Sequence, residues 1–341
     1  MARLWPWLAA GAFVCLAGIG VTARAVQVAV TRPLAPRSAT AHLVVVLSGM
    51  RLRQIGQLLQ ADGIVRFGWG FDLWALAHDD QRRLEAGTYR LGPWMTIPQI
   101  ATMLTSGDIA TASVTIPEGW DVDQVIAALE RAGLGTAAAL TSAADDPSLL
   151  QGLGIQASSR ARYPLEGFLF PDTYSFPVGS SPDAMFGRMT AQFSQEWTSD
   201  LQSAATSEGL NTLQAVTLAS IVQREVTDPG QMQAVAGIYL NRLRQGMDLD
   251  ADPTVLYGLG LTSWQGPLGS TQLASSSPYN TYAHTGLPPG PICNPGAAAL
   301  TAVAHPATLT ALYFLSAPDG QLVVADTYAE QLANQQKYLG Y

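Results

Sequence analysis

The sequence predicts an α+β protein with an N-terminal transmembrane helix, a small α+β module and a larger mixed α+β domain with a helical core. Three observations support this fold class. Residues 4–23 carry no charge, short strands alternate with short helices over the next hundred residues, and three helices follow between residues 185 and 244. With 341 residues, the chain is long enough to form two domains.

The composition and the short motifs exclude several classes of function. The formal net charge is -8 and Lys337 is the only lysine, so we expect no nucleic-acid-binding surface. The four histidines and two cysteines do not have the spacing of a metal site. Phosphate-binding and dinucleotide-binding glycine loops and the G-x-S-x-G elbow are absent as well, so we expect no metal, no cofactor and no acyl transfer.

The uncharged N-terminal segment predicts attachment to a membrane. Residues 4–23 lie between two arginines and are long enough, as a helix, to span a hydrocarbon core of about 30 Å. We therefore expect residues 1–24 to form an anchor and the proline-containing residues 25–40 to form an extended linker. A cleaved signal peptide with a small-x-small site at residues 23–25 is the alternative. The flanking charges alone favour the reverse orientation, because more arginines follow the segment than precede it.

Three stretches after the linker share one pattern, in which a short strand, a turn and a short helix follow one another. The strands are expected at residues 42–47, 88–91 and 113–116, and apolar residues at helical spacing follow each of them. Thr96 and Gln99 form a T-x-x-Q capping box at the start of the second helix. Each helix ends at a glycine: Gly63, Gly107 and Gly133. The repeated pattern predicts a small α+β module and not a doubly wound parallel sheet.

An additional helix is expected between the first two of these stretches, from Gly68 to His78. It carries three aromatic residues, Trp69, Phe71 and Trp74. Packing in the core is the simplest explanation for them. A surface that stacks on the apolar faces of sugar rings is the alternative, and the sequence leaves both open.

One acidic residue continues the buried stripe of a helix. The helix expected over residues 212–227 has a stripe of Leu218, Ile221 and Val222, and Glu225 extends it in the last turn. Partial burial and the negative end of the helix dipole both disfavour the ionised carboxylate, so we predict a raised pKa for Glu225. A carboxyl group that is still protonated near neutral pH suits a general acid. A helix-end glutamate paired with an arginine is the alternative.

Helices are also expected over residues 185–205 and 233–244, and two polar loops follow them. In the first loop, Asp250 and Asp252 are two residues apart. N-capping or bracing of the loop explains Asp252 better than a metal pair, because further ligands at motif spacing are absent. The second loop, residues 277–296, combines a Ser-Pro-Tyr-Asn-Thr-Tyr stretch with a proline-rich run. Prolines stiffen such a loop, so its hydroxyl and amide groups suit a ligand with many hydroxyls.

Five motifs of the chain resemble those of the bacterial endolytic murein transglycosylases, the YceG-like family. They are Ala219–Glu225, Asn241–Leu243, Asp252–Val255, Ser277–Tyr282 and Gly286–Ile292. The resemblance extends from the N-terminal segment to the C-terminus and includes residues 85–89, 117–120 and 165–174. So many motifs in the same order make a chance match very improbable.

The resemblance implies a single-pass inner-membrane protein whose catalytic domain lies on the periplasmic side. Residues 41–112 are then a LysM-like module and residues 113–341 the catalytic domain. The implied activity is endolytic cleavage of nascent peptidoglycan glycan strands, without a cofactor, close to the penicillin-binding synthases. The matching motifs place the catalytic glutamate at Glu225. They place a substrate cleft at Asn241, Asp252, Thr254, Tyr257, Ser277, Tyr279, Asn280 and Tyr282.

The chain also departs from the family pattern. Ala251 replaces a serine, Leu322 and Gln331 stand where the family has histidines, and Val324 stands where it has an aromatic residue. Three of these departures lie near the C-terminus, and all of them leave the glutamate motif intact.

The reaction that the resemblance implies is a lytic transglycosylation. Protonated Glu225 donates its proton to the glycosidic oxygen between N-acetylmuramic acid and N-acetylglucosamine. It then accepts the proton of the muramoyl C6 hydroxyl, which closes on C1 and leaves a 1,6-anhydro end. Two alternatives remain: a muramidase in which Asp252 or Glu166 activates water, and a non-catalytic scaffold that binds peptidoglycan.

Overall fold

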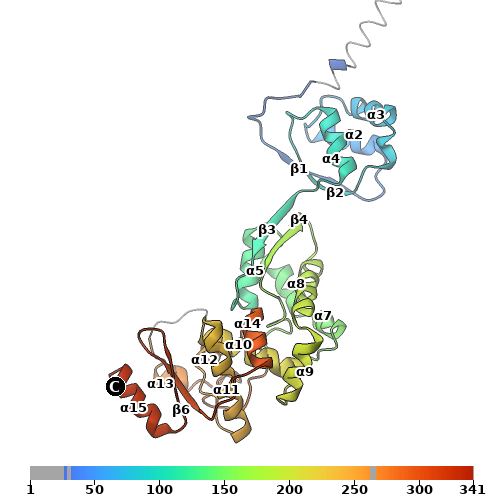
Figure 1. Ribbon diagram of the computed structural model, residues 1–341. Helices are drawn as coiled ribbons and strands as arrows, with labels where there is room; N and C mark the ends of the chain where they lie inside the picture. The colour runs from blue at the N-terminus through green and yellow to red at the C-terminus, as the bar shows by residue number, and fades with distance from the viewer. Residues whose placement is uncertain (1–26, 29–31, 262–265, 341) are drawn as a thin grey trace, which may run out of the picture. The chain divides into compact units, whose positions relative to one another are not determined.

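The computed structural model describes residues 27–28, 32–261 and 266–340. This part of the chain divides into two compact units (Figure 1). The first extends to Ala112 and includes Phe176–Gly179, and the second contains Ser113–Ser175 and the chain from Ser180 onward. The predicted transmembrane helix at residues 4–23 lies outside the described residues. Among those that are described, no helix has the length and apolar character needed to cross a membrane.

The first unit packs three helices against a two-stranded sheet. Strand β1 (His42–Val46) pairs antiparallel with β2 (Gly87–Leu91), from His42 opposite Leu91 to Val46 opposite Gly87. Helices α2 (Leu52–Ala61), α3 (Gly68–Ala77) and α4 (Ile97–Ser106) follow the expected positions, and a 3₁₀ turn, η1 (Asp80–Arg82), lies between α3 and β2. Because side chains alternate along a strand, Val44 and Val46 point into the core while Leu43 and Val45 are exposed.

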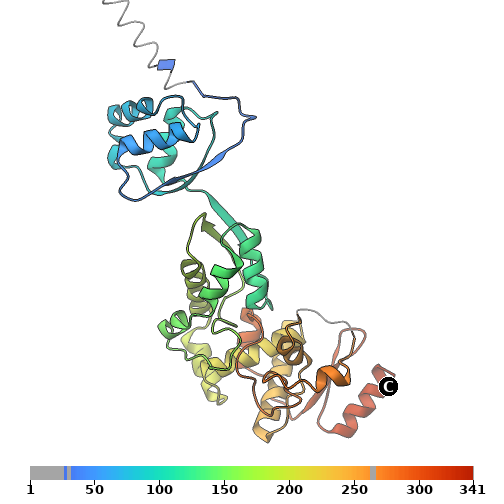
Figure 2. The same cartoon turned by 180° about the vertical axis from the view of Figure 1, so that it is seen from behind.

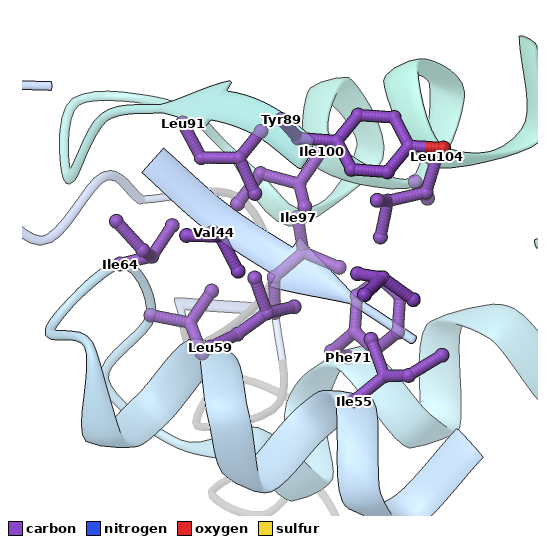
Figure 3. Packing of buried hydrophobic residues seen from close by; sticks show 13 residues of the cluster. Val44, Ile55, Leu59, Ile64, Phe71, Tyr89, Leu91, Ile97, Ile100 and Leu104 are labelled. Carbon is purple, nitrogen blue, oxygen red and sulfur yellow. The ribbon is translucent and has the colours of Figure 1, made fainter. Parts of the chain in front are cut away.

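The core of this unit is a single cluster of aliphatic and aromatic side chains (Figure 3). Phe71 of α3 is fully buried in it, which supports the core interpretation for that residue, and Trp74 packs against its edge. Trp69 is 44% exposed and stacks on Phe67 with ring centroids 5.6 Å apart. The three aromatic positions of α3 therefore do not share one role.

The helix ends of the first unit are those that the sequence predicts. The backbone N–H of Thr96 donates to Oε1 of Gln99 over 2.9 Å, as in the predicted capping box at the start of α4. Gly107 ends α4 with a φ of 64°, a conformation that is easy for glycine and strained for other residues.

The third strand-turn-helix stretch does not extend the β1–β2 sheet. Strand β3 (Thr111–Thr115) pairs instead with β4 (Thr173–Pro177) in a second two-stranded sheet, and α5 (Val122–Arg131) follows it. In β4, Tyr174 and Phe176 are buried, while Thr173, Ser175 and Pro177 are exposed. The expectation that all three stretches form one module is therefore wrong, because β3 finds its hydrogen-bonding partner about sixty residues further along the chain.

The helix expected over residues 185–205 is two helices. After the short helices α6 (Ala137–Ala144) and α7 (Ser148–Gly152), α8 (Pro182–Glu196) ends at Trp197 and α9 (Ser199–Ser207) begins directly afterwards. Trp197 has a ψ of 70°, which leaves the helical region, and the Thr198 side chain accepts a hydrogen bond from the backbone N–H of Leu201. An N-capping threonine and a buried tryptophan therefore break the predicted helix.

Three helices form the centre of the second unit. Helices α10 (Thr212–Glu225), α11 (Pro229–Gln245) and α14 (Ala297–Ala304) pack on one another (Figures 1 and 2). Helix α10 is buried almost all round, from Ala215 to Gln223. Helix α11 begins at Pro229, four residues before the expected start, where the Asp228 side chain accepts the backbone N–H of Gly230 at 2.7 Å.

The remaining elements surround the end of α10. Helix α12 (Asp252–Gly258) begins in the first polar loop, and the short helix α13 (Ser270–Leu273) comes just before the second. Near the C-terminus, β5 (Tyr313–Ser316) and β6 (Leu322–Ala325) form an antiparallel hairpin, and α15 (Tyr328–Tyr338) packs against it. The proline-rich loop is tied to α10, where Ser220 Oγ accepts the N–H of Ile292 at 3.0 Å.

Candidate active site

A cleft of 420 Å³ lies in the second unit, where α10 ends. Helix α10 contributes Glu225, and α11 contributes Tyr239 and Arg242. Asp252 at the start of α12 and Tyr282 form another part of the lining. Residues of β5 and of α15 complete it. Segments up to about 110 residues apart in the sequence therefore meet at one carboxyl group.

Glu225 is half-buried in this cleft. Its Oε1 accepts a 2.9 Å hydrogen bond from the hydroxyl of Tyr239. The pKa of the Glu225 carboxyl is raised to about 7. Burial is the main cause, the Tyr239 hydrogen bond and the Arg242 charge oppose it, and the negative charge of Asp252 acts in the same direction as burial. The predicted rise in this pKa is confirmed, with burial as the main cause. At neutral pH, a large fraction of this carboxyl still carries its proton.

Arg242 forms the positive side of the cleft and is itself nearly fully buried. Its guanidinium group donates to the carbonyl oxygens of Leu312, Asp248 and Leu249 and to Oδ2 of Asp250. It also lies over the ring of Tyr313, 5.1 Å from the centroid. Arg242 therefore joins α11, the loop before α12 and the start of β5, and it fixes the shape of the cleft.

Asp252 and Tyr282 form a second fixed pair in the cleft. The hydroxyl of Tyr282 donates to Oδ1 of Asp252 over 2.6 Å. This contact ties α12 to the Ser-Pro-Tyr-Asn-Thr-Tyr loop, as the bracing interpretation of Asp252 predicts. Burial, followed by this hydrogen bond to a carboxylate, raises the pKa of the Tyr282 hydroxyl, so the phenol stays protonated.

The structure brings three of the nine predicted site residues together: Glu225, Asp252 and Tyr282 line the cleft. The other six are not among the residues that line it. Asn241 is directed at the chain before β5, since its Nδ2 donates to the carbonyl oxygens of Leu309 and Ala311. Adjacent helical residues point about 100° apart, so the neighbouring Arg242 faces the cleft and Asn241 does not.

The remaining five predicted residues support the loops behind the cleft. Thr254 is fully buried and its hydroxyl donates to the Ala251 carbonyl oxygen. Nδ2 of the buried Asn280 donates to the carbonyl oxygens of Leu273 and Ser275. The loop also contains Ser277, whose Oγ accepts the N–H of Tyr279 at 3.3 Å. The rings of Tyr257 and Tyr279 pack edge to face, with centroids 4.8 Å apart. These side chains use their polar groups to hold the loop in shape.

Glu166, one candidate for a water-activating base, belongs to a separate buried cluster. Both of its carboxyl oxygens accept from the backbone N–H of Val122 at 3.2 Å, at the start of α5, and Oε2 accepts from the Tyr257 hydroxyl at 2.8 Å. Burial, together with the nearby charge of Asp121, raises its pKa to about 8. Glu166 does not line the cleft and is almost inaccessible to solvent.

Most residues that line the cleft were not predicted as part of the site, and Tyr239 and Arg242 are the two with the clearest contacts in it. Both belong to α11, whose C-terminal part contains the Asn-Arg-Leu motif, and they are three residues apart on one face. This i, i+3 pair next to a recognised motif is the signal that could have identified them. Nothing in the local sequence indicates the contribution of α15.

The altered C-terminal positions lie on the hairpin and on α15. Leu322 and Val324 belong to β6, and Gln331 belongs to α15 and lines the cleft. The Gln331 Nε2 donates to the carbonyl oxygen of Phe314 over 3.0 Å. A glutamine at this position therefore fastens α15 to β5 along the edge of the cleft.

These observations define the class of protein: an α+β enzyme-like chain with a helix-end carboxyl group, whose pKa is raised to about 7, in an aromatic-lined cleft. More particularly, the chain belongs to the YceG-like family, whose model matches residues 44–337.

Named relatives agree with this assignment. A Bacillus subtilis (strain 168) protein named endolytic murein transglycosylase is 28% identical over 321 residues, which cover 90% of this chain and 87% of the relative. A Streptococcus pneumoniae (serotype 2, strain D39) protein with the same name is 29% identical over 293 residues, which cover 79% of this chain and 53% of the relative. The crystal structure of a yceG-like protein from Listeria monocytogenes matches 87% of this chain and all of that chain, with a TM-score of 0.61 and 28% identity.

Proposed function

We propose that the protein is an endolytic peptidoglycan lytic transglycosylase that uses Glu225 as its general acid and base. One observation carries the proposal: Glu225 lies half-buried in a cleft, and burial raises its pKa to about 7. Curated relatives that carry the name endolytic murein transglycosylase match most of the chain, including this region. The substrate is then the glycan strand of peptidoglycan.

The reaction proceeds in two proton transfers. Protonated Glu225 donates its proton to the oxygen that links C1 of N-acetylmuramic acid to N-acetylglucosamine, and the C1–O bond breaks. The carboxylate then accepts the proton of the muramoyl C6 hydroxyl while that oxygen bonds to C1. Water is not consumed, and the products are a 1,6-anhydro end and a free N-acetylglucosamine C4 hydroxyl. Because the nucleophile belongs to the substrate, one carboxyl group is sufficient.

The rest of the cleft supports these steps. The rings of Tyr282, Tyr313 and Tyr328 offer apolar faces on which pyranose rings can stack. The Asp252 carboxylate, held by Tyr282, places a negative charge in the site where positive charge develops at C1. A muramidase would use this same carboxylate to activate water, and this is the second candidate function that the geometry favours. Glu166 lies outside the cleft and does not fit that role.

The experiment that tests the proposal is digestion of purified sacculi followed by mass spectrometry of the fragments. The wild type should release fragments with 1,6-anhydro ends, and Glu225→Gln should lower the rate by at least about a hundredfold while the protein stays folded. Reducing ends from the wild type would show a muramidase. Sacculus binding by both proteins, with cleavage by neither, would show a scaffold.

We also propose the wider setting that the sequence suggests. Residues 4–23 anchor the chain in the inner membrane with the second unit outside the cytoplasm, and the first unit acts as a LysM-like module. Penicillin-binding synthases are the expected neighbours, since they produce the nascent strands. Membrane fractionation of the full chain, compared with a version lacking residues 1–24, tests the anchor: the full chain should sediment with membranes and the shortened version should not.

A further inference from the structure

We infer that Tyr239 is a positioning residue that decides which oxygen of Glu225 carries the catalytic proton. The inference rests on the proposed function and adds a role that the glutamate motif does not contain. Tyr239 lies on α11, fourteen residues after Glu225, and only 1% of its surface is exposed. Its hydroxyl oxygen is 2.9 Å from Oε1 of Glu225.

The direction of this hydrogen bond follows from the partners of the phenol. The carboxyl of Glu225 is the acceptor to which the Tyr239 hydroxyl donates, and burial together with the Glu225 charge keeps the pKa of this phenol well above its usual value. Tyr239 therefore remains a donor throughout the working pH range. An oxygen that accepts this hydrogen bond is the carbonyl oxygen of the protonated carboxyl, so the proton is on Oε2.

This arrangement has two consequences for catalysis. First, the acid presents its proton from one defined oxygen, which a general acid needs in order to reach the glycosidic oxygen in a fixed geometry. Second, the carboxylate formed after the first transfer keeps a charge-assisted hydrogen bond on Oε1, while Oε2 is free to take the C6 hydroxyl proton. The same oxygen thus gives the first proton and receives the second.

Other charged and titratable groups also face Glu225, and none of them replaces Tyr239. Arg242 from α11 lowers the pKa of Glu225 and Asp252 from α12 raises it. The hydroxyl of Tyr282 is engaged with Asp252. Among the hydrogen bonds of the described residues, only the Tyr239 bond reaches a carboxyl oxygen of Glu225 directly.

The first test is Tyr239→Phe, which removes the hydroxyl and keeps the ring that packs edge to face on Phe314. Loss of a donor to the carboxylate should move the high-pH limb of the kcat profile to higher pH by about one unit. It should also lower the maximal kcat by about tenfold, with little change in KM, because the proton is no longer held on one oxygen. Tyr313→Phe is the matched control: Tyr313 also lines the cleft but is not bonded to Glu225, so the limb should not move.

A second variant should move the high-pH limb in the opposite direction, and it keeps the inference testable if Tyr239→Phe does not fold. Replacing Tyr239 by 3,5-difluorotyrosine keeps the shape and makes the phenol a stronger donor, so the limb should move to lower pH. If wild-type protein forms anhydro ends but neither variant moves the limb, the inference is wrong and the proposed function stands. If the wild type forms no anhydro ends, the proposed function itself fails.

Discussion

The hydroxyl of Tyr257 donates a 2.8 Å hydrogen bond to Oε2 of Glu166 in the interior of the second unit. Both residues are buried, and the same carboxyl also accepts from the backbone N–H of Val122 at the start of α5. Burial raises the pKa of Glu166 to about 8. A carboxyl group that titrates this high is a structural element whose protonation state affects the free energy of unfolding.

We predict that Glu166→Gln makes the stability of the protein less dependent on pH. The pKa of Glu166 rises from its ordinary value of 4.5 to about 8 on folding, so the folded state binds more protons between these values. Wild-type stability should therefore fall as pH rises from about 4.5 to about 8, with a slope of up to about 1.4 kcal/mol per pH unit from this group. Urea unfolding at pH 5, 6.5 and 8 measures the slope. Glu130→Gln, at an exposed position, should leave it unchanged.

The cleavage rate should fall as pH rises through about 7. The pKa of Glu225 is raised to about 7, and only the protonated carboxyl can donate to the glycosidic oxygen, so the acid form is lost above this pH. Initial rates of sacculus solubilisation from pH 5 to pH 9 measure this high-pH limb of the rate profile. A rate that stays level up to pH 9 would contradict the role of Glu225 as the acid.

In Asp252→Asn, the high-pH fall of the cleavage rate should shift to lower pH, and the product should still carry 1,6-anhydro ends. The Asp252 charge raises the pKa of Glu225, so its removal lowers that pKa and the acid form disappears earlier. An asparagine oxygen can still accept the Tyr282 hydrogen bond, so the loop should stay in place. The measurements are the pH profile and the mass of the fragments. If the wild type instead forms reducing ends and Asp252→Asn no longer does, Asp252 is the base of a muramidase.

The sequence predicted the helix that carries Glu225 because its signals are local. A stripe of Leu218, Ile221 and Val222 defines the buried face of α10, and all three side chains are fully buried. The raised pKa of Glu225 follows from its position on that stripe, and its direction is confirmed. The spacing of apolar residues over a few helical turns defines the buried face of a helix. The burial of a residue on that face can therefore be predicted from the sequence alone.

The rest of the site depends on contacts between distant segments. Residues of β5 and α15 line the cleft, and β5 begins almost ninety residues after Glu225. The spacing of apolar residues does not predict which distant segment will pack next to Glu225. The motif around Asn241 was recognised, but only the backbone direction of α11 shows that Arg242 faces the cleft. Likewise, the hydroxyl of Thr254 and the amide of Asn280 look available for a ligand in the sequence, but in the structure they donate to backbone carbonyl oxygens.

Arg242→Lys should lower the free energy of unfolding by about 2–4 kcal/mol. The planar guanidinium donates to three carbonyl oxygens and to Oδ2 of Asp250 at once. An ammonium group has fewer donors at one point and cannot form all of these hydrogen bonds. Buried acceptors are then left without donors. Arg244→Lys on the same helix is the control: its ion pair with Glu208 is more exposed, so its loss should cost less than about 1 kcal/mol. Denaturant unfolding of both variants gives the comparison.

The crossing of α2 and α3 in the first unit allows a test of whether the two units unfold separately. At Gly68, an added Cβ would press on the carbonyl group of Gly56 and lie 3.1 Å from the N–H nitrogen of Gln57, and these backbone atoms cannot yield as a side chain can. Gly68→Ala should therefore destabilise the first unit by about 1–3 kcal/mol.

The two units have separate cores, so calorimetry should show one transition moved to lower temperature and the other unchanged. Gly152→Ala is the matched control, because no atom lies within 4 Å of its added Cβ. A single transition that moves as a whole in Gly68→Ala would show that the units unfold together. In that case the first unit would contribute to the stability of the cleft around Glu225.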